Sequence, residues 1–558
     1  MYSHVVLVVI FMLAGCMKLG PDYQKPGIGI QVPAGYQYAP TERTMPEPDD
    51  QWWLVFNDPE LNQLVDEVLK NNLDIRIATA AVLEVRAQLV STRADRFPQV
   101  GVESQGQRQQ RPKQTSVPGQ AFSVDREITT YDLSLPASFE IDLWGRLARA
   151  EEAARANLLE AEGNRRTVAQ TVVAEAITLY LQMESFERAI EIAERLVESF
   201  RRSLALVESR YKRGLTSVLD VRQARRVLAG AESTLPSLRQ NLGITQQALA
   251  VLLGRYPETR PPRLQPEDYY KRLDPVPPGL PSELLLRRPD IRAAEAQLVA
   301  LNALVGVAKA SRFPRIVLTG TYGYTSKDLD RLFKPENELW SIALGIAQPL
   351  FDAGKLQAGQ RAAEARYQQG VVAYAKTVLT AFAEVEGTFL TREEQLKRRD
   401  YVVRFLHEAR AAQRIAESRY EKGLVDFLTV LDTQRTRFQG ESDLVEVDFV
   451  LLNNRVNLHR ALGGGWADPG PVMVEKETET TKNTKGNDAE MRGRGEIGRY
   501  GDSWTNVLAS ARQARKVQGE KRDNKAKTTL VLALLAFPAF LAKTPSVFHE
   551  WRIARYEY

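Results

Sequence analysis

The residues of this chain that could do acid–base, nucleophilic or metal chemistry are few and widely separated. The four histidines, at positions 4, 407, 459 and 549, show no spacing typical of metal ligands. No glycine-rich phosphate loop follows a predicted strand. The many carboxylates lie in helical patterns typical of solvated faces and of pairs between helices. The sequence therefore predicts no enzyme, no bound metal and no cofactor.

Cys16 is the one residue at which covalent modification is expected. It is the only cysteine, so a disulfide within the chain is impossible. It ends the tetrapeptide Leu13-Ala14-Gly15-Cys16, which follows a short apolar run and resembles the signal of bacterial lipoproteins. In such proteins the cysteine is lipidated and becomes the first mature residue, and the absence of aspartate at Met17 favours the outer membrane. An ordinary signal peptide with an incidental cysteine is the alternative.

Charge and hydropathy exclude two broad classes of protein. The formal net charge is +5 over 558 residues, which is too small to indicate a nucleic-acid-binding protein. Between the signal segment and residue 468, no segment approaches the ~20 apolar residues that a membrane-spanning helix needs. If the mature chain crosses a membrane, it must do so as β-strands, which pair their backbone groups with one another.

The chain contains an internal duplication, and a repeat determines the architecture. Two motifs recur 216 residues later and three more recur 209 residues later, so one copy carries a length change of seven residues. The pairs are Asp74-Ile75-Arg76 with Asp290-Ile291-Arg292, Arg96-Phe97-Pro98 with Arg312-Phe313-Pro314, Gly145-Arg146-Leu147 with Gly354-Lys355-Leu356, Glu208 to Tyr211 with Glu417 to Tyr420, and Leu253-Gly254 with Leu462-Gly463. Each copy predicts a helix, a β-hairpin, a long helix, a tight turn and a second long helix.

Each copy contains two segments in which apolar and polar residues alternate, as they do in two-faced β-strands. They are 100–107 and 131–143 in the first copy, and 316–325 and 340–346 in the second. This alternation fits transmembrane strands, and a soluble hairpin with one packed face is the alternative. Four strands are fewer than the roughly eight of the smallest bacterial barrels, and lipid does not tolerate an open edge. The strands therefore predict a barrel shared by two or three chains.

The segments between the strand pairs predict very long helices. Residues 145–213 and 355–422 contain no proline, and each would form a helix on the order of 100 Å long. Helices of this length must pack along others, as in a coiled-coil wall. Gly214 and Gly423 follow them and suit the left-handed position that ends a helix. Each copy thus predicts a helical hairpin whose tip lies far from the strands.

Five motifs, taken in order, resemble those of the TolC-like outer membrane factors, and more closely the lipoprotein (NodT-type) branch of tripartite efflux systems. The resemblance covers about residues 16–466. The motifs are Gly20-Pro21-Asp22-Tyr23 with Pro26, Ser138 to Arg146, Leu285 to Ile291, Pro349 to Gly354, and Leu428 to Asp432.

This resemblance implies a mixed, mainly α fold in which three copies assemble. Four strands from each chain would form one twelve-stranded barrel in the outer membrane, and the long helices would form an α-barrel through the periplasm. The implied partners are two further copies of the chain, outer membrane lipid, a periplasmic adaptor (membrane fusion) protein at the helical tips, and an inner-membrane pump of the RND type. No nucleic-acid partner is expected.

The resemblance also implies a gate at the periplasmic tips. Leu428 and Asp432 match positions at which side chains constrict the channel, so three leucines would form an apolar plug and three aspartates an acidic ring that attracts cations. Asp220 and Tyr420 match a tip contact of the closed state, whereas Val425 replaces the arginine of the same network. By spacing alone, Leu428 would be a packing residue and Asp432 an exposed carboxylate.

We therefore expect a passive outer membrane conduit for small molecules such as drugs or solvents. Two alternatives stay open, namely a channel for type I protein secretion and a non-channel lipoprotein with a structural coiled coil. The second would not need alternating strands. The lipoprotein signal and the Arg288-Pro289-Asp290 motif favour the efflux branch.

The expected organisation has five parts. They are a signal peptide over 1–15, a lipidated segment over 16–58, repeat 1 over 59–270 with its hairpin at about 99–143, repeat 2 over 271–468 with its hairpin at about 315–352, and a tail over 469–558. The tail is mostly polar and charged, which predicts disorder. Its apolar segment 530–542 is interrupted by Pro538 and is too short to span a bilayer.

Overall fold

The computed structural model describes residues 18–27, 29, 35–38, 51–110, 127–257 and 287–464. Every helix and strand described below belongs to the unit Met1–Val472. The signal segment, Cys16 and the tail lie outside the described residues, so their interpretation stays a prediction.

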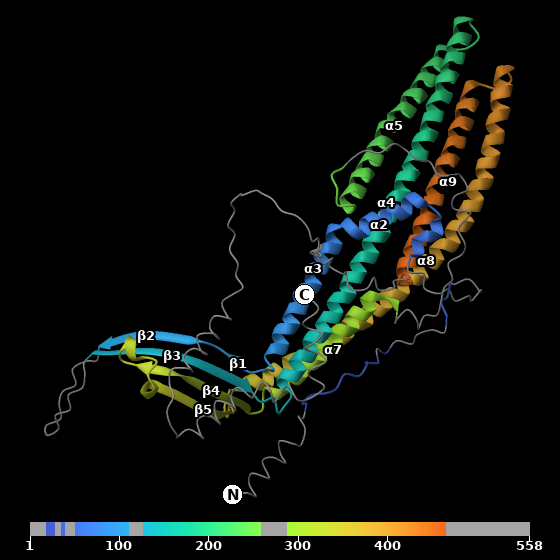
Figure 1. Cartoon of the computed structure of the whole chain (residues 1–558). Coiled ribbons are helices and arrows are strands. Elements are labelled where there is room, and N and C mark those ends of the chain that lie inside the picture. Colours follow the sequence, from blue (N-terminus) through green and yellow to red (C-terminus); the bar gives the residue numbers. More distant parts are fainter. Residues whose placement is uncertain are drawn as a thin grey trace, which may run out of the picture. The chain divides into compact units, whose positions relative to one another are not determined.

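Two helical hairpins form most of the described structure (Figure 1). The first joins α4 (Arg146–Lys212) to α5 (Val218–Leu252), and the second joins α8 (Lys355–Glu421) to α9 (Phe427–Ala461). Both α4 and α8 contain 67 residues, and both α5 and α9 contain 35. The equal lengths confirm the duplication, and each 67-residue helix spans on the order of 100 Å.

Shorter helices precede each pair of strands. The first repeat has η1 (Trp52–Phe56), α2 (Pro59–Asn71) and α3 (Leu73–Ala94), and the second has α7 (Pro289–Ala310). Within the described residues, α7 alone is long and apolar enough to cross a membrane by length and composition. Half of its apolar window is buried, and it packs against α4 and α8. We therefore assign α7 to the core of the helical region.

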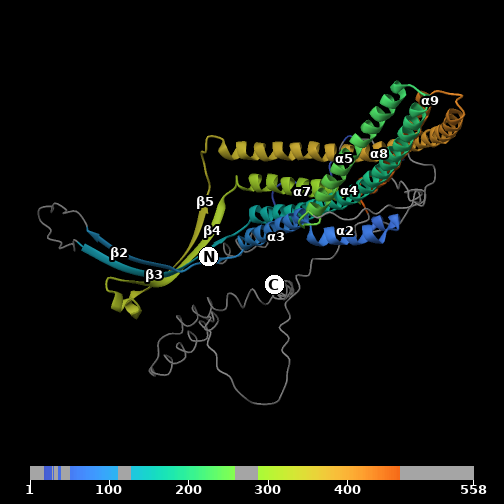
Figure 2. The same cartoon turned by 90° about the horizontal axis from the view of Figure 1, so that it is seen from above.

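Strands from both repeats form one antiparallel sheet (Figure 2). On one side β3 (Glu127–Glu140) pairs with β1 (Gln99–Val100) and β2 (Glu103–Gln110). On its other side β3 pairs with β4 (Arg315–Ser326), which pairs with β5 (Glu338–Ala347). The two predicted strand pairs are therefore present.

The ends of two predicted strands differ from the sequence expectation. The first strand is interrupted between β1 and β2. The second ends at Glu140 instead of Leu143, because Asp142 is used by the helix that follows: its carboxylate accepts a hydrogen bond of 2.8 Å from the backbone N–H of Ala148 at the start of α4.

The register gathers the apolar residues of three strands on one face of the sheet. Leu135 lies opposite Tyr322, which lies opposite Trp340, and directly opposed residues project to the same side. The same face carries Leu133, Ala137, Phe139, Ile316, Leu318, Tyr324, Ile342, Leu344 and Ile346. The other face carries small and polar residues, among them Asp132, Ser134, Ser138, Thr319, Thr321 and Ser341. The exception is β2, which is polar on both faces.

The helical core consists of three apolar clusters of buried residues. The largest joins η1 and α2 to α4 and includes Phe56, Leu61 and Ile177. A second joins α7, α8 and the end of α9. The third lies at the tips, where residues of α4, α5, α8 and α9 meet. The third cluster is the one that supports the candidate site.

Candidate gate at the helical tips

The tight turns that follow α4 and α8 have the same backbone conformation. Gly214 and Gly423 both have a φ of 73°, in the left-handed region that glycine adopts without steric cost. After each glycine, a backbone N–H returns to the last helical turn, from Leu215 to the oxygen of Arg210 and from Leu424 to that of Arg419, both at 2.9 Å. Both glycines therefore stand at the turns where the sequence predicts them.

Side chains hold the start of the second helix at each tip. Asp220 accepts hydrogen bonds from the hydroxyl of Thr216 at 2.5 Å and from the backbone N–H of Ser217 at 3.1 Å, while its own N–H donates to Ser217 Oγ. The hydrogen bond from Thr216, and to a lesser extent those from Ser217, lower the pKa of Asp220. At the other tip, Asp426 caps α9 by accepting the N–H of Thr429 at 2.9 Å.

Tyr420 joins the two hairpins to each other. The guanidinium of Arg210, on α4, lies 4.7 Å from the Tyr420 ring and donates to its backbone oxygen at 3.0 Å. The ring of Phe427, on α9, packs against the Tyr420 ring with 5.6 Å between the ring centroids. Burial raises the pKa of Tyr420, and the nearby Asp220 carboxylate adds to this effect. No hydrogen bond joins Tyr420 to Asp220 in the part of the chain described; the Asp220 carboxylate accepts instead from Thr216 and Ser217.

Leu428 and Asp432 lie one turn apart on an exposed face of α9. Leu428 is 55% exposed, and Asp432 is also exposed. The neighbouring Phe427, Val430 and Leu431 point the other way, into the apolar cluster at the tips. Within the described residues the side chains of Leu428 and Asp432 have no packing role, which leaves them available to face other copies of the chain.

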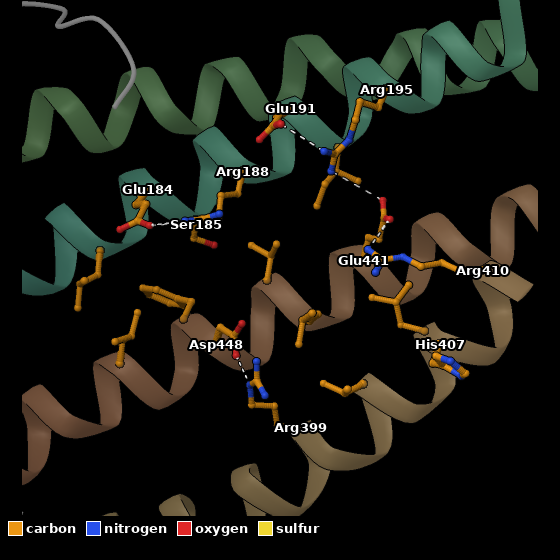
Figure 3. Close-up of a pocket in the computed structure, with 18 of the residues that line it drawn as sticks. Glu184, Ser185, Arg188, Glu191, Arg195, Arg399, His407, Arg410, Glu441 and Asp448 are labelled. Carbon is orange, nitrogen blue, oxygen red and sulfur yellow. Dashed lines mark hydrogen bonds and ion pairs between the residues drawn. The ribbon is translucent and has the colours of Figure 1, made fainter. Parts of the chain in front are cut away.

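The opposite side of α9 forms the floor of a groove between α4 and α8 (Figure 3). The groove has a volume of about 510 Å³. Glu441 of α9 lies at its floor and is only 5% exposed. Its carboxylate accepts hydrogen bonds from Arg410 of α8 at 3.0 Å and Arg437 of α9 at 3.1 Å, and its second oxygen lies 3.9 Å from Arg195 of α4. One carboxylate thus links three helices from both hairpins.

A second buried carboxylate, Glu184 of α4, lines the same groove (Figure 3). Arg188 donates to one of its oxygens at 3.1 Å, and the other oxygen has no hydrogen-bond partner within the described residues. Burial raises the pKa of Glu184 to about 7; the Asp58 and Glu187 carboxylates add to the rise and Arg188 opposes it. Glu184 therefore changes its charge near neutral pH.

Comparison with known proteins identifies the family. The model of the family described as outer membrane efflux protein matches residues 64–255 and 280–464. The chain belongs to the outer membrane efflux protein family. The match spans both repeats and ends with α9, so the gate candidates and the groove all lie within it.

Three members of this family illustrate the similarity. The solvent efflux pump outer membrane protein SrpC of Pseudomonas putida is 35% identical over 470 residues, which cover 84% of this chain and 99% of SrpC. The probable outer membrane lipoprotein SilC of Salmonella typhimurium is 32% identical, with 82% and 98% covered. The solved structure of the outer-membrane channel OprN matches with a TM-score of 0.73 at 32% identity, covering 80% of this chain and 99% of OprN. The fold of this efflux protein is thus that of channels with a periplasmic helical barrel and an outer membrane β-barrel.

Sequence reasoning missed both buried carboxylates of the groove. Each has an arginine four residues away, as many exposed helical carboxylates do. The available signal was the helical phase of Glu441, which lies 11 residues after Val430 and 11 before Leu452. Eleven residues make three helical turns, so Glu441 shares a face with these two buried residues.

Proposed function

We propose that this efflux family member is the outer membrane channel subunit of a tripartite efflux system. In this proposal three copies form a passive conduit that carries small molecules across the periplasm and the outer membrane. The observation that carries the proposal is a sheet with one apolar face, whose outer strands pair on one side only within the described residues, on a chain dominated by two long helical hairpins.

The sheet edges support assembly with other copies. The outer positions of the sheet belong to β2 and β5, each of which pairs on one side only within the described chain. In lipid every unpaired backbone group would cost several kcal/mol. Pairing β5 of one copy with β2 of the next would satisfy both edges, and three copies would close a twelve-stranded barrel.

The N-terminal segment supports a lipid anchor at Cys16. The backbone N–H of Leu19 donates at 3.1 Å to the oxygen of Trp144, just after β3. The buried Arg149 donates to the oxygens of Leu19 and Gly20 and pairs with Asp22 at 2.8 Å. A lipid on Cys16 would therefore start close to the periplasmic ends of the strands, at the membrane boundary.

The tips support the gate and the partner interface. Three copies of Leu428 and Asp432 would form an apolar ring and an acidic ring across the channel. Val425 packs in the apolar cluster at the tips and makes no charged link. The proposed partners at the tips are a periplasmic adaptor protein and, through it, an inner-membrane pump of the RND type.

The proposed cargo is small organic molecules such as drugs or solvents. The named role of SrpC as part of a solvent efflux pump supports this class. Type I protein secretion is the second candidate for the cargo. Deleting the gene should raise the accumulation of a fluorescent dye in cells and leave the secreted proteins unchanged, whereas the loss of a secreted protein would favour the second candidate.

The decisive test of the channel is electron microscopy of the detergent-purified protein together with its mass in solution. A three-fold hollow cylinder of trimer mass is expected, because only shared strands close the barrel. A monomer or a solid rod would refute the shared barrel and favour a non-channel coiled-coil lipoprotein.

A further inference from the structure

Helix α9 carries two sets of functional side chains on opposite faces. The gate candidates Leu428 and Asp432 are exposed on one face. Glu441 follows Asp432 by nine residues, which corresponds to a rotation of about 180° on a helix of 3.6 residues per turn. Any rotation of α9 about its axis therefore moves the gate side chains and Glu441 together.

A ladder of polar contacts holds the buried face of α9 at one rotation. Gln434 of α9 donates to Ser203 of α4 at 3.2 Å and to Glu417 of α8 at 2.9 Å. Two turns further on, Glu441 binds Arg410 and lies near Arg195. Both steps connect α9 to α4 and to α8 at the same time, so they oppose its rotation in either direction.

For Arg410 and Arg437, Glu441 is the carboxylate of this ladder that no other acid replaces. In the part of the chain described, it is the only carboxylate within ion-pair distance of Arg410 or Arg437. The other acids of the groove have their own partners, Arg188 for Glu184, Arg195 for Glu191 and Arg399 for Asp448. Glu441 itself is buried, whereas the side chains of Arg195 and Arg410 are about half exposed. Removing the carboxylate therefore breaks contacts between helices without leaving a buried charge unpaired.

We propose that Glu441 positions the gate: through its hydrogen bond with Arg410 of α8 and its ion pair at 3.9 Å with Arg195 of α4, it sets the rotation of α9 and thereby the direction in which Leu428 and Asp432 point. The inference rests on the proposed channel function. Glu441 touches no cargo and is a positioning residue that acts through the gate side chains.

The test is the single-channel conductance of full-length trimers in a planar bilayer. Glu441→Gln should raise the conductance about twofold and weaken the cation preference, since the two rings no longer meet at the axis. Glu441→Asp keeps the charge and should stay close to the wild type. The matched control is Glu232→Gln, which removes an exposed pair with Arg201 between α4 and α5 and should change nothing.

A double-mutant cycle separates positioning from a general loss of structure. In a channel that already carries Leu428→Ala and Asp432→Ala, Glu441→Gln should add no further change in conductance. Additive effects would overturn the proposal, as would an unchanged conductance of Glu441→Gln in the wild-type background. If Glu441→Gln forms no trimer, the same cycle is measured with Arg410→Gln, which removes the half-exposed arginine that donates to Glu441 from α8. That cycle then decides the proposal. A wild-type protein that does not conduct would instead refute the channel function itself.

Discussion

Three carboxylates of the helical region have different environments and therefore different roles. Asp432 is exposed on α9 and belongs to the candidate gate. Glu441 is buried among arginines of three helices. Glu184 is buried with one unpartnered oxygen and a raised pKa. Each lies in a helix with an arginine three or four residues away, so the differences come from what packs around each side chain.

Replacing both Leu428 and Asp432 by alanine should raise the single-channel conductance and reduce the preference for cations. Each trimer would lose an apolar ring and three negative charges at its narrowest point. Planar-bilayer recordings measure both quantities. Asp400→Ala, which removes an exposed charge from α8 away from the tips, is the control and should leave both unchanged. Values equal to those of the wild type in the double variant would mean that the constriction lies elsewhere.

Glu184→Gln should stabilise the folded protein above neutral pH and have little effect in acid. Burial raises the pKa of Glu184 to about 7 in the folded protein, against 4.5 for an ordinary glutamate. Between these two pH values, Glu184 therefore binds a proton when the chain folds. The folded protein becomes less stable as the pH rises through this window. Above this pH window, the ionised Glu184 side chain lowers the free energy of unfolding by on the order of 3 kcal/mol.

The thermal unfolding midpoint of the purified protein, measured across this pH range, tests the prediction for Glu184. The gain in midpoint of the variant should increase with pH and level off above about pH 7. Glu198→Gln, which alters an exposed pair with Arg201, should give a difference that does not depend on pH. A gain that is the same in acid and in base would contradict the assignment of a raised pKa.

Among the elements, the two helical hairpins repeat one design. Helices of 67 and 35 residues are joined by a turn with a left-handed glycine and a side-chain N-cap. The caps themselves differ, since Ser217 forms a capping box with Asp220 and Asp426 caps alone. The turn geometry is thus the shared part, and glycine is its determinant.

Gly214→Ala and Gly423→Ala should each destabilise a tip by about 1 kcal/mol, because an L-residue is strained in the left-handed region. A Cβ at either position meets no atom within 4 Å, so the backbone alone accounts for the effect. Gly359, inside α8, also has open space around its Cβ. Gly359→Ala should therefore be stabilising. Limited proteolysis at the tips measures the effect, and equal cleavage of all three variants would contradict it.

For the whole molecule, the sheet and the helical region differ in how much of their packing one chain provides. The helical region has its own apolar clusters within one chain. The sheet has an apolar face and two edges that the described part of one chain does not cover. The β-barrel therefore depends on assembly, whereas much of the helical packing is complete in a single copy.

Truncation after Asp468 should leave trimer assembly and transport intact. The family match ends at residue 464, and α9, the last helix described, ends at Ala461. Mass in solution and dye efflux from cells are the measurements. Truncation after Gly423, which removes α9 and with it Phe427, Val430 and Leu431 of the apolar cluster at the tips, should abolish both. Loss of the trimer or of transport on truncation after Asp468 would give the tail a role.

The sequence by itself determined the elements of this protein and their order. Period-two alternation predicted the strands, proline-free stretches predicted the long helices, and Gly214 and Gly423 predicted the turns between them. These features are local, because side-chain periodicity, capping and left-handed glycines depend on neighbouring residues. The motif at Leu428 to Asp432 pointed to the gate through resemblance, since its spacing alone indicated an ordinary helix.

Only the tertiary structure decided which side chains meet. The cluster of Arg195, Arg410 and Glu441 joins residues more than 200 positions apart. Arg149 of the first repeat likewise pairs with Asp22 of the N-terminal segment. The Asp220 carboxylate accepts from the hydroxyl of Thr216 and the backbone N–H of Ser217 in its own turn, and its tip contact with Tyr420 stays a prediction. Periodicity tells which face of a helix is buried, but the partner on that face depends on how distant helices pack.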